Sequence, residues 1–240
     1  MAKVSVIVPA AGAGKRFGSS GAILGKKVFQ RIGDRPVFMC ALELFASRRD
    51  VVQTMLVVAE EDVAELDRQF GRRLGLMGVD VVVGGPTRSQ SVRNALVEVI
   101  DAADLICVHD AVRPCVSAQR IDAVFKQAEK TGAAILAWPV RGTLKMASHA
   151  GVIERTVPRE GLWEAQTPQV FRRDLLRQAY AAGGDATDDA HLVERLGHPV
   201  SLVMGEAWNI KITTPADLAL AAAVIQALPG PGTGPDNQGR

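Results

Sequence analysis

The stretch VPAAGAGKRFGSSGAILGKKVF, residues 8–29, overlaps the end of the short apolar run VSVIV at residues 4–8. A β-branched run that leads into small residues and glycines predicts a buried strand followed by a loop whose backbone can approach a ligand closely. The cations Lys15, Arg16, Lys26 and Lys27 lie in this loop. Backbone N–H groups together with several cations suit a triphosphate, so we expect the loop to bind a nucleotide. The alternative is a solvated basic loop in which the glycines only supply flexibility.

Two familiar phosphate-binding templates do not fit the loop. A dinucleotide fingerprint needs the spacing G-x-G-x-x-G and an acidic residue about 20 residues further on. Gly12 and Gly14 fit this spacing, but the third glycine, Gly18, stands one position too late. The Walker A pattern would need glycine in place of Pro9 and serine or threonine in place of Arg16. The loop therefore belongs to neither class.

Further along the chain, short β-branched runs alternate with helical patterns. This alternation predicts a mostly parallel, doubly wound (Rossmann-like) α/β sheet, and near-continuous apolar strands predict that helices cover both of its faces. The expected strands are VSVIV (4–8), TMLVVA (54–59), DVVV (80–83), LICVH (105–109), AAILAWPV (133–140), VSLVMG (200–205) and NIKIT (209–213). Helices are expected at residues 36–47, 60–70, 89–100, 117–132, 173–183, 187–197 and 215–228. Ser117 is the expected N-cap of the fourth helix and Gly132 its expected end.

The alternation breaks at about residues 140–166, where the pattern is typical of a hairpin with His149, Ala150 and Gly151 near its tip. This segment has too few apolar residues for a core of its own, so we expect an arm that projects from the sheet and packs against another subunit. Residues 1–228 are expected to form a single domain. The Pro/Gly-rich residues 229–240 predict a disordered tail.

Composition sets wider limits. The chain has 240 residues, 48% of them hydrophobic, and a net charge of +2. That charge balance predicts no nucleic-acid partner, which would need a clustered basic face. Three cysteines without metal spacing, no signal peptide and no apolar run of membrane length predict a reduced, cytoplasmic protein that does not enter a membrane.

Five stretches together give the chain a specific resemblance. VPAAGAGKRFG (8–18) resembles the P-A-A-G-x-G-x-R-M/F-G signature of nucleotidyltransferases that act on sugar and polyol phosphates. The other four are GGPTRSQSV (84–92), VHDAVRPC (108–115), PREGLWEAQTPQVF (158–171) and NIKITTPADLALA (209–221). In this order and at this spacing they resemble the 2-C-methyl-D-erythritol 4-phosphate cytidylyltransferase family, over residues 3 to about 226.

The resemblance implies an enzyme that joins CTP to 2-C-methyl-D-erythritol 4-phosphate (methylerythritol phosphate below) and releases pyrophosphate, in non-mevalonate isoprenoid biosynthesis. It also implies that Arg16 and Lys27 stabilise the charge on the reacting phosphorus, with Lys26 as the alternative to Lys27. The residues that it implies for nucleotide binding are Ala10, Ala11, Gly12, Ala13, Gly14, Gly85, Arg88 and Ser91.

Asp110 follows a buried strand, and α/β sheets place their ligands at the carboxyl ends of strands. A carboxylate there is a natural ligand for Mg²⁺, which also takes oxygens from substrate phosphates. The alternatives are an N-cap or a salt bridge with Arg113. His109, beside it, is expected to be structural, because no second histidine or cysteine stands at metal spacing.

The residues implied to position the alcohol phosphate are Arg159, Lys211, Thr143, Arg113 and Thr167. Arg159 and Thr143 lie on the expected arm, so the resemblance implies a homodimer whose arms complete each other's sites. The acidic pair Asp188-Asp189 is typical of a helix start, with Thr187 as the expected N-cap.

Three other functions remain open at this point. A cytidylyltransferase of the same family that uses ribitol 5-phosphate shares much of the pattern. A glycosyltransferase with a related nucleotide fold would commonly carry a D-x-D metal motif, which the chain lacks. A catalytically inactive nucleotide-binding module would not need Arg16, Lys27 and Asp110 together.

Overall fold

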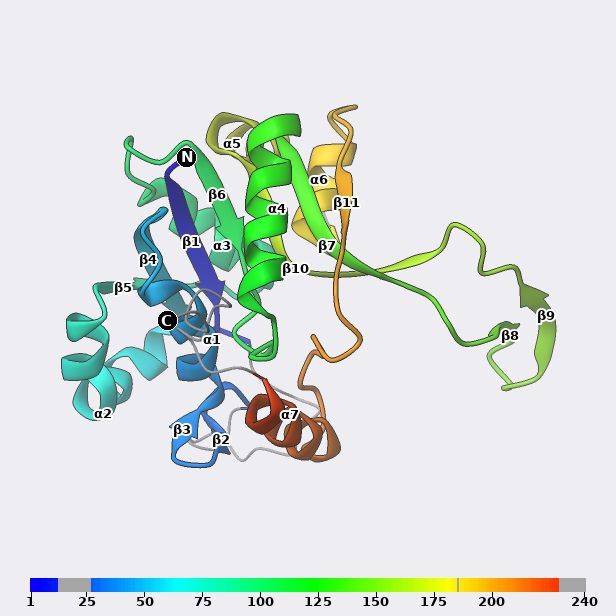
Figure 1. Ribbon diagram of the computed structural model, residues 1–240, viewed down its shortest axis with the longest axis horizontal. Helices are drawn as coiled ribbons and strands as arrows, with labels where there is room; N and C mark the ends of the chain where they lie inside the picture. Colours follow the sequence, from blue (N-terminus) through cyan, green and yellow to red (C-terminus); the bar gives the residue numbers. More distant parts are fainter. Residues whose placement is uncertain (13–26, 185, 229–240) are drawn as a thin grey trace, which may run out of the picture.

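The computed structural model describes residues 1–12, 27–184 and 186–228. At its centre is a seven-stranded sheet in the order β11-β7-β10-β6-β1-β4-β5 (Figure 1). Neighbouring strands pair in parallel except for β10, which is antiparallel to both β6 and β7. The strands are β1 (Val4–Pro9), β4 (Val51–Val58), β5 (Val79–Val83), β6 (Leu105–Val108), β7 (Ala133–Pro139), β10 (Trp163–Arg172) and β11 (Ser201–Met204). The expected mostly parallel α/β sheet is confirmed.

Helices cover both faces of this sheet. One face carries α1 (Val37–Ala46), α2 (Val63–Leu76), α4 (Ala118–Thr131) and α7 (Pro215–Ala227). The other face carries α3 (Arg88–Val97), α5 (Arg173–Ala182) and α6 (Asp189–Glu194). Short 3₁₀ turns, η3 (Lys27–Phe29) and η4 (Glu60–Asp62), and a small hairpin of β2 (Arg31–Ile32) and β3 (Arg35–Pro36) complete the body.

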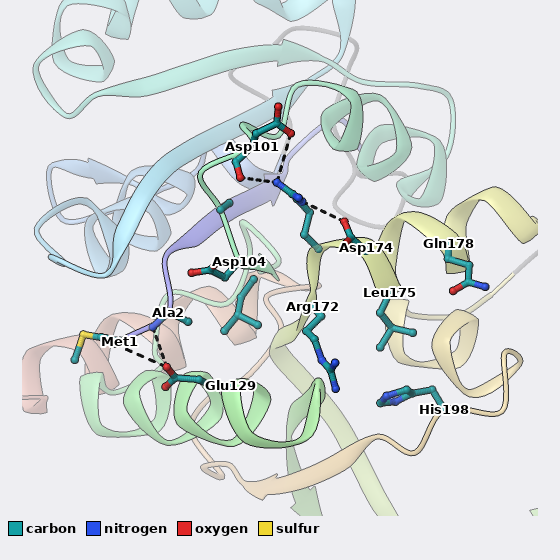
Figure 2. Close-up of a pocket in the computed structure, with 13 residues that line it drawn as sticks. Met1, Ala2, Asp101, Asp104, Glu129, Arg172, Asp174, Leu175, Gln178 and His198 are labelled. Atoms are coloured by element: carbon teal, nitrogen blue, oxygen red, sulfur yellow. Dashed lines mark hydrogen bonds and ion pairs between the residues drawn. The ribbon is translucent and has the colours of Figure 1, made fainter.

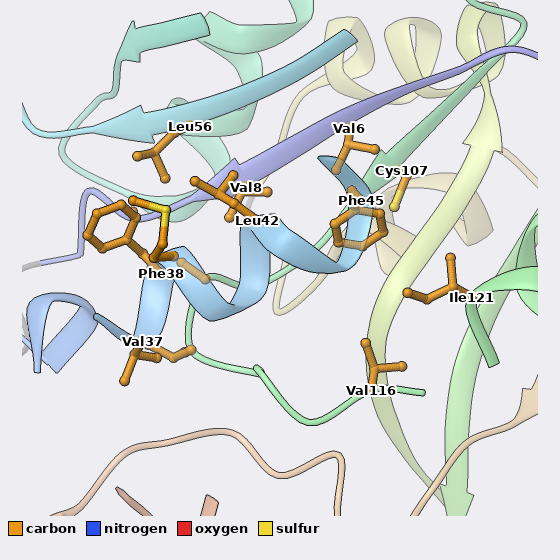
Figure 3. Close-up of a cluster of buried hydrophobic side chains, with 14 of the residues drawn as sticks. Val6, Val8, Val37, Phe38, Leu42, Phe45, Leu56, Cys107, Val116 and Ile121 are labelled. Atoms are coloured by element: carbon orange, nitrogen blue, oxygen red, sulfur yellow. The ribbon is translucent and has the colours of Figure 1, made fainter. Parts of the chain in front are cut away.

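The alternation of side chains along β1 divides the core into two layers. Val6 and Val8 pack into the cluster under α1, together with Phe38 and Leu42 (Figure 3). Ile7, between them in the sequence, packs into the cluster under α3, α5 and α6. Successive strand residues point to opposite faces, so an apolar run without polar interruption is what a doubly covered strand requires.

One expected strand differs in burial. β5 has the expected position, but most of its residues are partly or fully exposed, with Val81 and Val83 among the exposed large side chains. Within the described part of the chain, β5 forms the edge of the sheet and pairs with β4 alone. The prediction that the near-continuous apolar strands are covered on both faces is therefore wrong for β5.

The ends of two helices test the capping predictions. Ser117 caps α4, since its side chain accepts the Arg120 N–H, and Gly132 ends the helix at φ +88°. Both predictions are confirmed. For α6 the predicted N-cap Thr187 is wrong, because the Asp188 side chain accepts the His191 N–H instead.

Two other segments differ from the sequence-based expectation. NIKIT, residues 209–213, forms no strand; instead, its backbone contacts the loop after β6. β10 was not expected in the centre of the sheet, yet its residues 166–171 are buried between β6 and β7. Its polar sequence, QTPQVF, does not suggest a central strand. Gln166 and Gln169 can be buried there because specific hydrogen bonds satisfy their side chains.

The expected arm is present. β7 and β10 continue beyond the sheet into a projecting hairpin of β8 (Leu144–Ala147) and β9 (Ile153–Val157) (Figure 1). At its tip, the Ser148 N–H donates to Val152 O and Gly151 has φ +76°, which confirms the predicted turn. The expected disordered tail, residues 229–240, lies outside the described residues.

The three cysteines, Cys40, Cys107 and Cys115, are buried free thiols. Over the described ranges, every helix falls short of the length and apolar character needed to cross a membrane.

Candidate active site

A pocket lies at the carboxyl edge of the sheet, where the loops after β1, β5 and β6 meet η3 and the segment before α7. This is the edge at which open α/β sheets place their ligands. The pocket brings together nine of the residues that the sequence singled out: Ala10, Ala11, Gly12, Lys27, Gly85, Arg88, Ser91, Asp110 and Lys211.

Two glycines allow the loop after β5 to pack closely. A Cβ on Gly85 would lie 2.2 Å from Cγ of Gln90, and a Cβ on Gly84 would lie 2.8 Å from Oγ of Ser91. The buried Ser91 hydroxyl accepts the Gly85 N–H at 3.1 Å and donates to Thr87 O at 2.9 Å. Ser91 thus shapes the loop from within, and its contact with the nucleotide stays a prediction.

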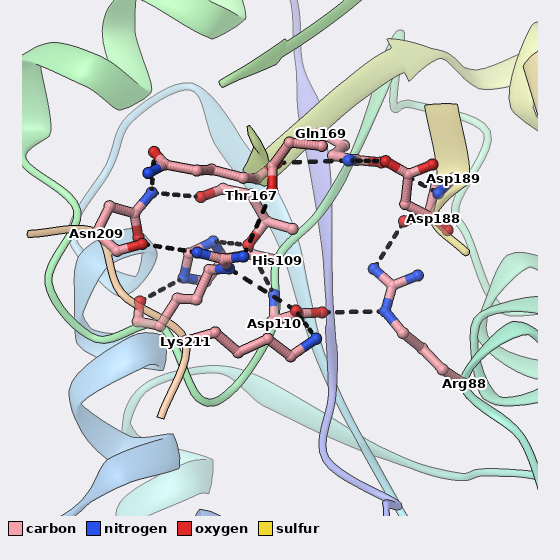
Figure 4. Close-up of polar contacts among 12 residues, drawn as sticks. Arg88, His109, Asp110, Thr167, Gln169, Asp188, Asp189, Asn209 and Lys211 are labelled. Carbon is pink, nitrogen blue, oxygen red and sulfur yellow. Dashed lines mark hydrogen bonds and ion pairs between the residues drawn. The ribbon is translucent and has the colours of Figure 1, made fainter. Parts of the chain in front are cut away.

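Asp110, directly after His109 at the end of β6, is the centre of the charge arrangement (Figure 4). Lys211 Nζ lies 2.7 Å from its Oδ2, and Arg88 Nε donates to its Oδ1 at 3.0 Å. Arg113 Nε lies further away, 3.9 Å from Oδ2. Burial alone would raise the pKa of the Asp110 carboxyl, but the charges of Arg88, Lys211 and Arg113 outweigh it and hold this pKa well below its usual range. Asp110 is therefore an ionised carboxylate enclosed by cations.

His109 supports the backbone of Asp110. Its Nε2 lies 2.9 Å from Arg113 O, which can only accept, so Nε2 carries the proton. Nδ1 then accepts the hydroxyl proton of Thr167 at 3.0 Å, and Thr167 Oγ1 accepts the Asp110 N–H at 3.1 Å. Burial lowers the pKa of His109 to about 4, so the ring is neutral at physiological pH. The Thr167 hydroxyl is engaged in these two hydrogen bonds, and its contact with the alcohol phosphate stays a prediction.

The segment that carries Lys211 is fixed to the loop after β6. The Ile212 N–H donates to Val112 O at 2.9 Å. Arg113 Nη1 donates to Asn209 O at 2.7 Å. These contacts occupy backbone groups that a strand would use for pairing, which is why the predicted strand does not form. They also hold Lys211 beside Asp110.

Among the described residues, four further predicted ones do not line this pocket: Arg113 and Thr167, which contact Asp110 from beside it, and Thr143 and Arg159. Thr143 and Arg159 lie exposed on the arm, where Arg159 follows β9 and donates to Arg141 O. Ala13, Gly14 and Arg16, with the alternative Lys26, lie outside the described residues.

The sequence did not predict that Asp189 contacts a residue of the site. Arg88 Nη2 donates to Asp189 Oδ2 at 2.7 Å, although the two residues are 101 positions apart in the chain. The only signal in the sequence was the pair Asp188-Asp189, which is equally typical of an ordinary helix start.

A second cavity lies at the opposite edge of the sheet, near the start of β1 and β6 (Figure 2). With about 730 Å³ it is larger than the carboxyl-edge pocket, for which the described residues enclose about 190 Å³. Several of its charged groups pair with one another, as in the contacts of the Met1 amino group with Glu129 and of Arg173 with Asp101. None of the residues predicted for function lines it. Position and composition therefore favour the smaller pocket.

Comparison with known proteins gives one consistent result. Residues 4–227 match the family described as IspD, 2-C-methyl-D-erythritol 4-phosphate cytidylyltransferase. The enzyme of this name from Rhodopirellula baltica is 44% identical over 237 residues, which cover 93% of this chain and 95% of that one. The enzyme of this name from Pelotomaculum thermopropionicum is 41% identical over 235 residues, 96% and 97% of the two chains. The crystal structure of the enzyme from Thermus thermophilus superposes with a TM-score of 0.77 at 36% identity and covers 93% of this chain and 99% of that one. The chain belongs to the 2-C-methyl-D-erythritol 4-phosphate cytidylyltransferase family.

Proposed function

We propose that this chain transfers CMP from CTP to 2-C-methyl-D-erythritol 4-phosphate at the carboxyl-edge pocket, as a step of non-mevalonate isoprenoid biosynthesis. The products are 4-diphosphocytidyl-2-C-methyl-D-erythritol and pyrophosphate. Family membership supports the reaction itself. One observation supports this pocket as the site of the reaction: Lys27, Arg88, Asp110 and Lys211 line it together with the residues that follow β1.

The chemistry needs fixed positive charge more than it needs a base. A phosphate oxygen of methylerythritol phosphate attacks the α-phosphorus of CTP, a new P–O bond forms, and the bond to the leaving pyrophosphate breaks. A phosphate monoester with a second pKa near 6 is already largely dianionic at neutral pH, so no side chain has to remove a proton. The barrier comes from two anions that repel each other and from charge gathered on a crowded phosphorus. Positioning and preorganised cations lower such a barrier.

The proposal assigns a role to each group of residues. In the proposal, the backbone of Ala10, Ala11 and Gly12 and the loop at Gly85 approach the nucleotide, because neither carries a large side chain into the pocket. Lys27, together with Arg16, stabilises the charge that develops on the phosphorus. Lys211, with Arg113 and Thr167, holds the phosphate of the attacking alcohol.

Magnesium is part of the proposal, with Asp110 as its ligand from the protein. Within the described ranges, no three metal-ligating side chains stand close enough together to hold an ion. One ionised carboxylate nevertheless fits Mg²⁺ well, since this ion commonly takes one or two carboxylates and completes its shell with substrate phosphates and water. When bound, the ion would neutralise part of the triphosphate charge. Asp110 would then exchange a contact with Lys211 or Arg88 for a contact with the ion.

A homodimer is also part of the proposal. Arg159 and Thr143 are exposed on the projecting arm, away from the pocket of their own chain. The arm further exposes Val152 and Ile153, which are 65% and 60% accessible, together with Trp163. A surface of this kind is typical of one that another subunit covers. An isologous dimer would bring each arm to the partner's pocket, and residues 1–228 would act as one catalytic domain in each subunit.

Parallel assays test the proposal. Pyrophosphate release is measured with CTP and either methylerythritol phosphate or ribitol 5-phosphate, and then with other nucleoside triphosphates. Rapid release with methylerythritol phosphate alone is the expected result. Faster release with ribitol 5-phosphate would assign the chain to a different alcohol, and release from neither would leave only nucleotide binding.

A further inference from the structure

Asp189 is a buried charge that the proposed reaction does not yet use. It is the first residue of α6 and is fully buried. Its neighbour Asp188 faces the other way and serves the helix, since it caps α6 and accepts from Gln169 Nε2 at 2.9 Å. The acidic pair of the sequence is thus divided: one carboxylate caps the helix and the other points toward the active site (Figure 4).

The position of Asp189 is fixed from several sides. Gln169 Oε1, from β10, accepts the N–H groups of Asp189 at 3.1 Å and of Ala190 at 3.0 Å. The Tyr180 hydroxyl, from α5, donates to Asp189 Oδ1. Burial, followed by the negative charge of Asp189, raises the pKa of the Tyr180 hydroxyl, which therefore keeps its proton and remains a donor. A buried carboxylate is stable only with such partners and a compensating cation.

The compensating cation is Arg88. Its Nη2 donates to Asp189 Oδ2 at 2.7 Å, and its Nε donates to Asp110 Oδ1 at 3.0 Å. The guanidinium therefore lies between a structural carboxylate and the proposed magnesium ligand. Burial would lower the pKa of Arg88, but the charges of Asp189 and Asp110, in this order, raise it well above its usual value.

The two cations closest to Asp110 differ in how firmly they are held. The Lys211 side chain is 41% exposed, and Asp110 is its ion-pair partner in the structure. The Arg88 side chain is less exposed and has a second carboxylate behind it. A free arginine side chain would lose rotamer entropy when a ligand orders it. Asp189 orders the Arg88 side chain before any ligand arrives, so this entropy loss does not weaken nucleotide binding.

We infer that Asp189 is a positioning residue of cytidylyl transfer, which holds the Arg88 guanidinium in the pocket so that it meets the phosphates of CTP in a fixed orientation. This inference rests on the proposed role of Arg88 in nucleotide binding. Tyr180 supports the same carboxylate, whereas the Asp188 side chain caps α6 and contacts Gln169.

The test compares isosteric variants. Asp189→Asn removes the charge and keeps the shape, Tyr180→Phe removes only the hydroxyl, and Asp188→Asn makes the same chemical change one residue away. The dissociation constant of CTP is measured by calorimetry without the second substrate, and kcat and KM are measured for each substrate separately. Melting temperatures show whether each variant folds.

We expect Asp189→Asn to weaken CTP binding and to lower kcat/KM for CTP by roughly 10- to 100-fold, the range for a hydrogen bond between charged groups. KM for methylerythritol phosphate should change less than threefold, and Asp188→Asn should bind CTP like the parent. Tyr180→Phe should shift CTP binding in the same direction by a smaller factor. It also provides the test if Asp189→Asn does not fold.

A double-mutant cycle with Arg88→Ala separates positioning from general stability. If Asp189 acts through Arg88, the double variant binds CTP no more weakly than Arg88→Ala alone. Additive losses, or an equal loss for both substrates that follows the melting temperature, would overturn the inference. An Arg88→Ala variant with parental CTP affinity would overturn it as well, while turnover by the parent enzyme would still support the proposed reaction.

Discussion

Lys211 Nζ lies 2.7 Å from Asp110 Oδ2, and the two side chains differ sharply in exposure, at 41% and 8%. The carboxylate is held in place by burial and by the Thr167 contact to its backbone, whereas the lysine has room to move. A lysine that neutralises Asp110 in the free enzyme can therefore turn to a substrate phosphate when the pocket fills.

Removing this lysine should affect the attacking substrate most. We expect Lys211→Met to lower kcat/KM for methylerythritol phosphate by about 100-fold, because loss of one preorganised donor costs roughly 3 kcal/mol. Steady-state kinetics with each substrate varied in turn measure the effect. Lys130→Met, the same change on the exposed end of α4, is the matched control and should keep parental kinetics. A loss confined to CTP binding would contradict the role given to Lys211.

The two neighbouring lysines at the end of the glycine loop should behave differently. Lys27 lines the pocket, so Lys27→Ala should reduce kcat by about 100-fold or more. Lys26→Ala should stay within threefold of the parent, and Arg16→Ala should resemble Lys27→Ala. Single-turnover rates at saturating substrates distinguish chemistry from binding. A large loss in Lys26→Ala with a small one in Lys27→Ala would exchange the two assignments.

The buried His109 predicts how stability depends on pH. Burial lowers its pKa from 6.5 to about 4 in the folded protein, so between these values the unfolded state binds the proton more readily. The free energy of unfolding should therefore fall as pH drops from 6.5 to 4, by about 3 kcal/mol in total, and should be insensitive to this group above pH 6.5. Asp110, whose folded pKa is lowered from 3.8, loses its contribution only at still lower pH. Denaturant unfolding at a series of pH values measures the slope.

His109→Gln provides the control for this slope. The variant should be less stable than the parent at neutral pH, because it disturbs the contacts with Arg113 O and Thr167, but its stability should change less between pH 6.5 and 4. Equal slopes in both proteins would assign the pH dependence to other groups.

Mixing experiments test the shared active site. Lys27→Ala changes the pocket and Arg159→Ala changes the arm, so each variant should be nearly inactive alone. After subunit exchange at equal amounts, activity should return to about a quarter of the parental value, because half of the dimers are mixed and each holds one intact site. Mixing Arg159→Ala with Thr143→Ala, which both change the arm, should restore nothing. If the first mixture also stays inactive, each site is complete within one subunit.

The sequence predicted the parts of this protein that depend on local pattern. The buried strand β1, the caps of α4 and the place of Asp110 after a buried strand all follow from residues close together in the chain. β10 escaped prediction because Gln166 and Gln169 are buried only by partners on distant segments, such as Glu206 O and the start of α6.

The same reason explains the errors at the site. The segment around Lys211 has the alternation of a strand, but Arg113 and the carbonyl of Val112 take its backbone groups. The role of Asp189 depends on Arg88, which only the folding of α3 and α6 onto one face of the sheet brings near. Local periodicity carries no information about such pairs.

The central claim is that cations fixed around one pocket promote a direct displacement at the α-phosphorus of CTP, without a covalent enzyme intermediate. The stereochemical course at this phosphorus tests it most directly, using CTP with sulfur at one α-oxygen of known configuration and analysis of the product configuration. A single in-line displacement predicts inversion. Retention would show two successive displacements through an enzyme-bound intermediate and would contradict the account.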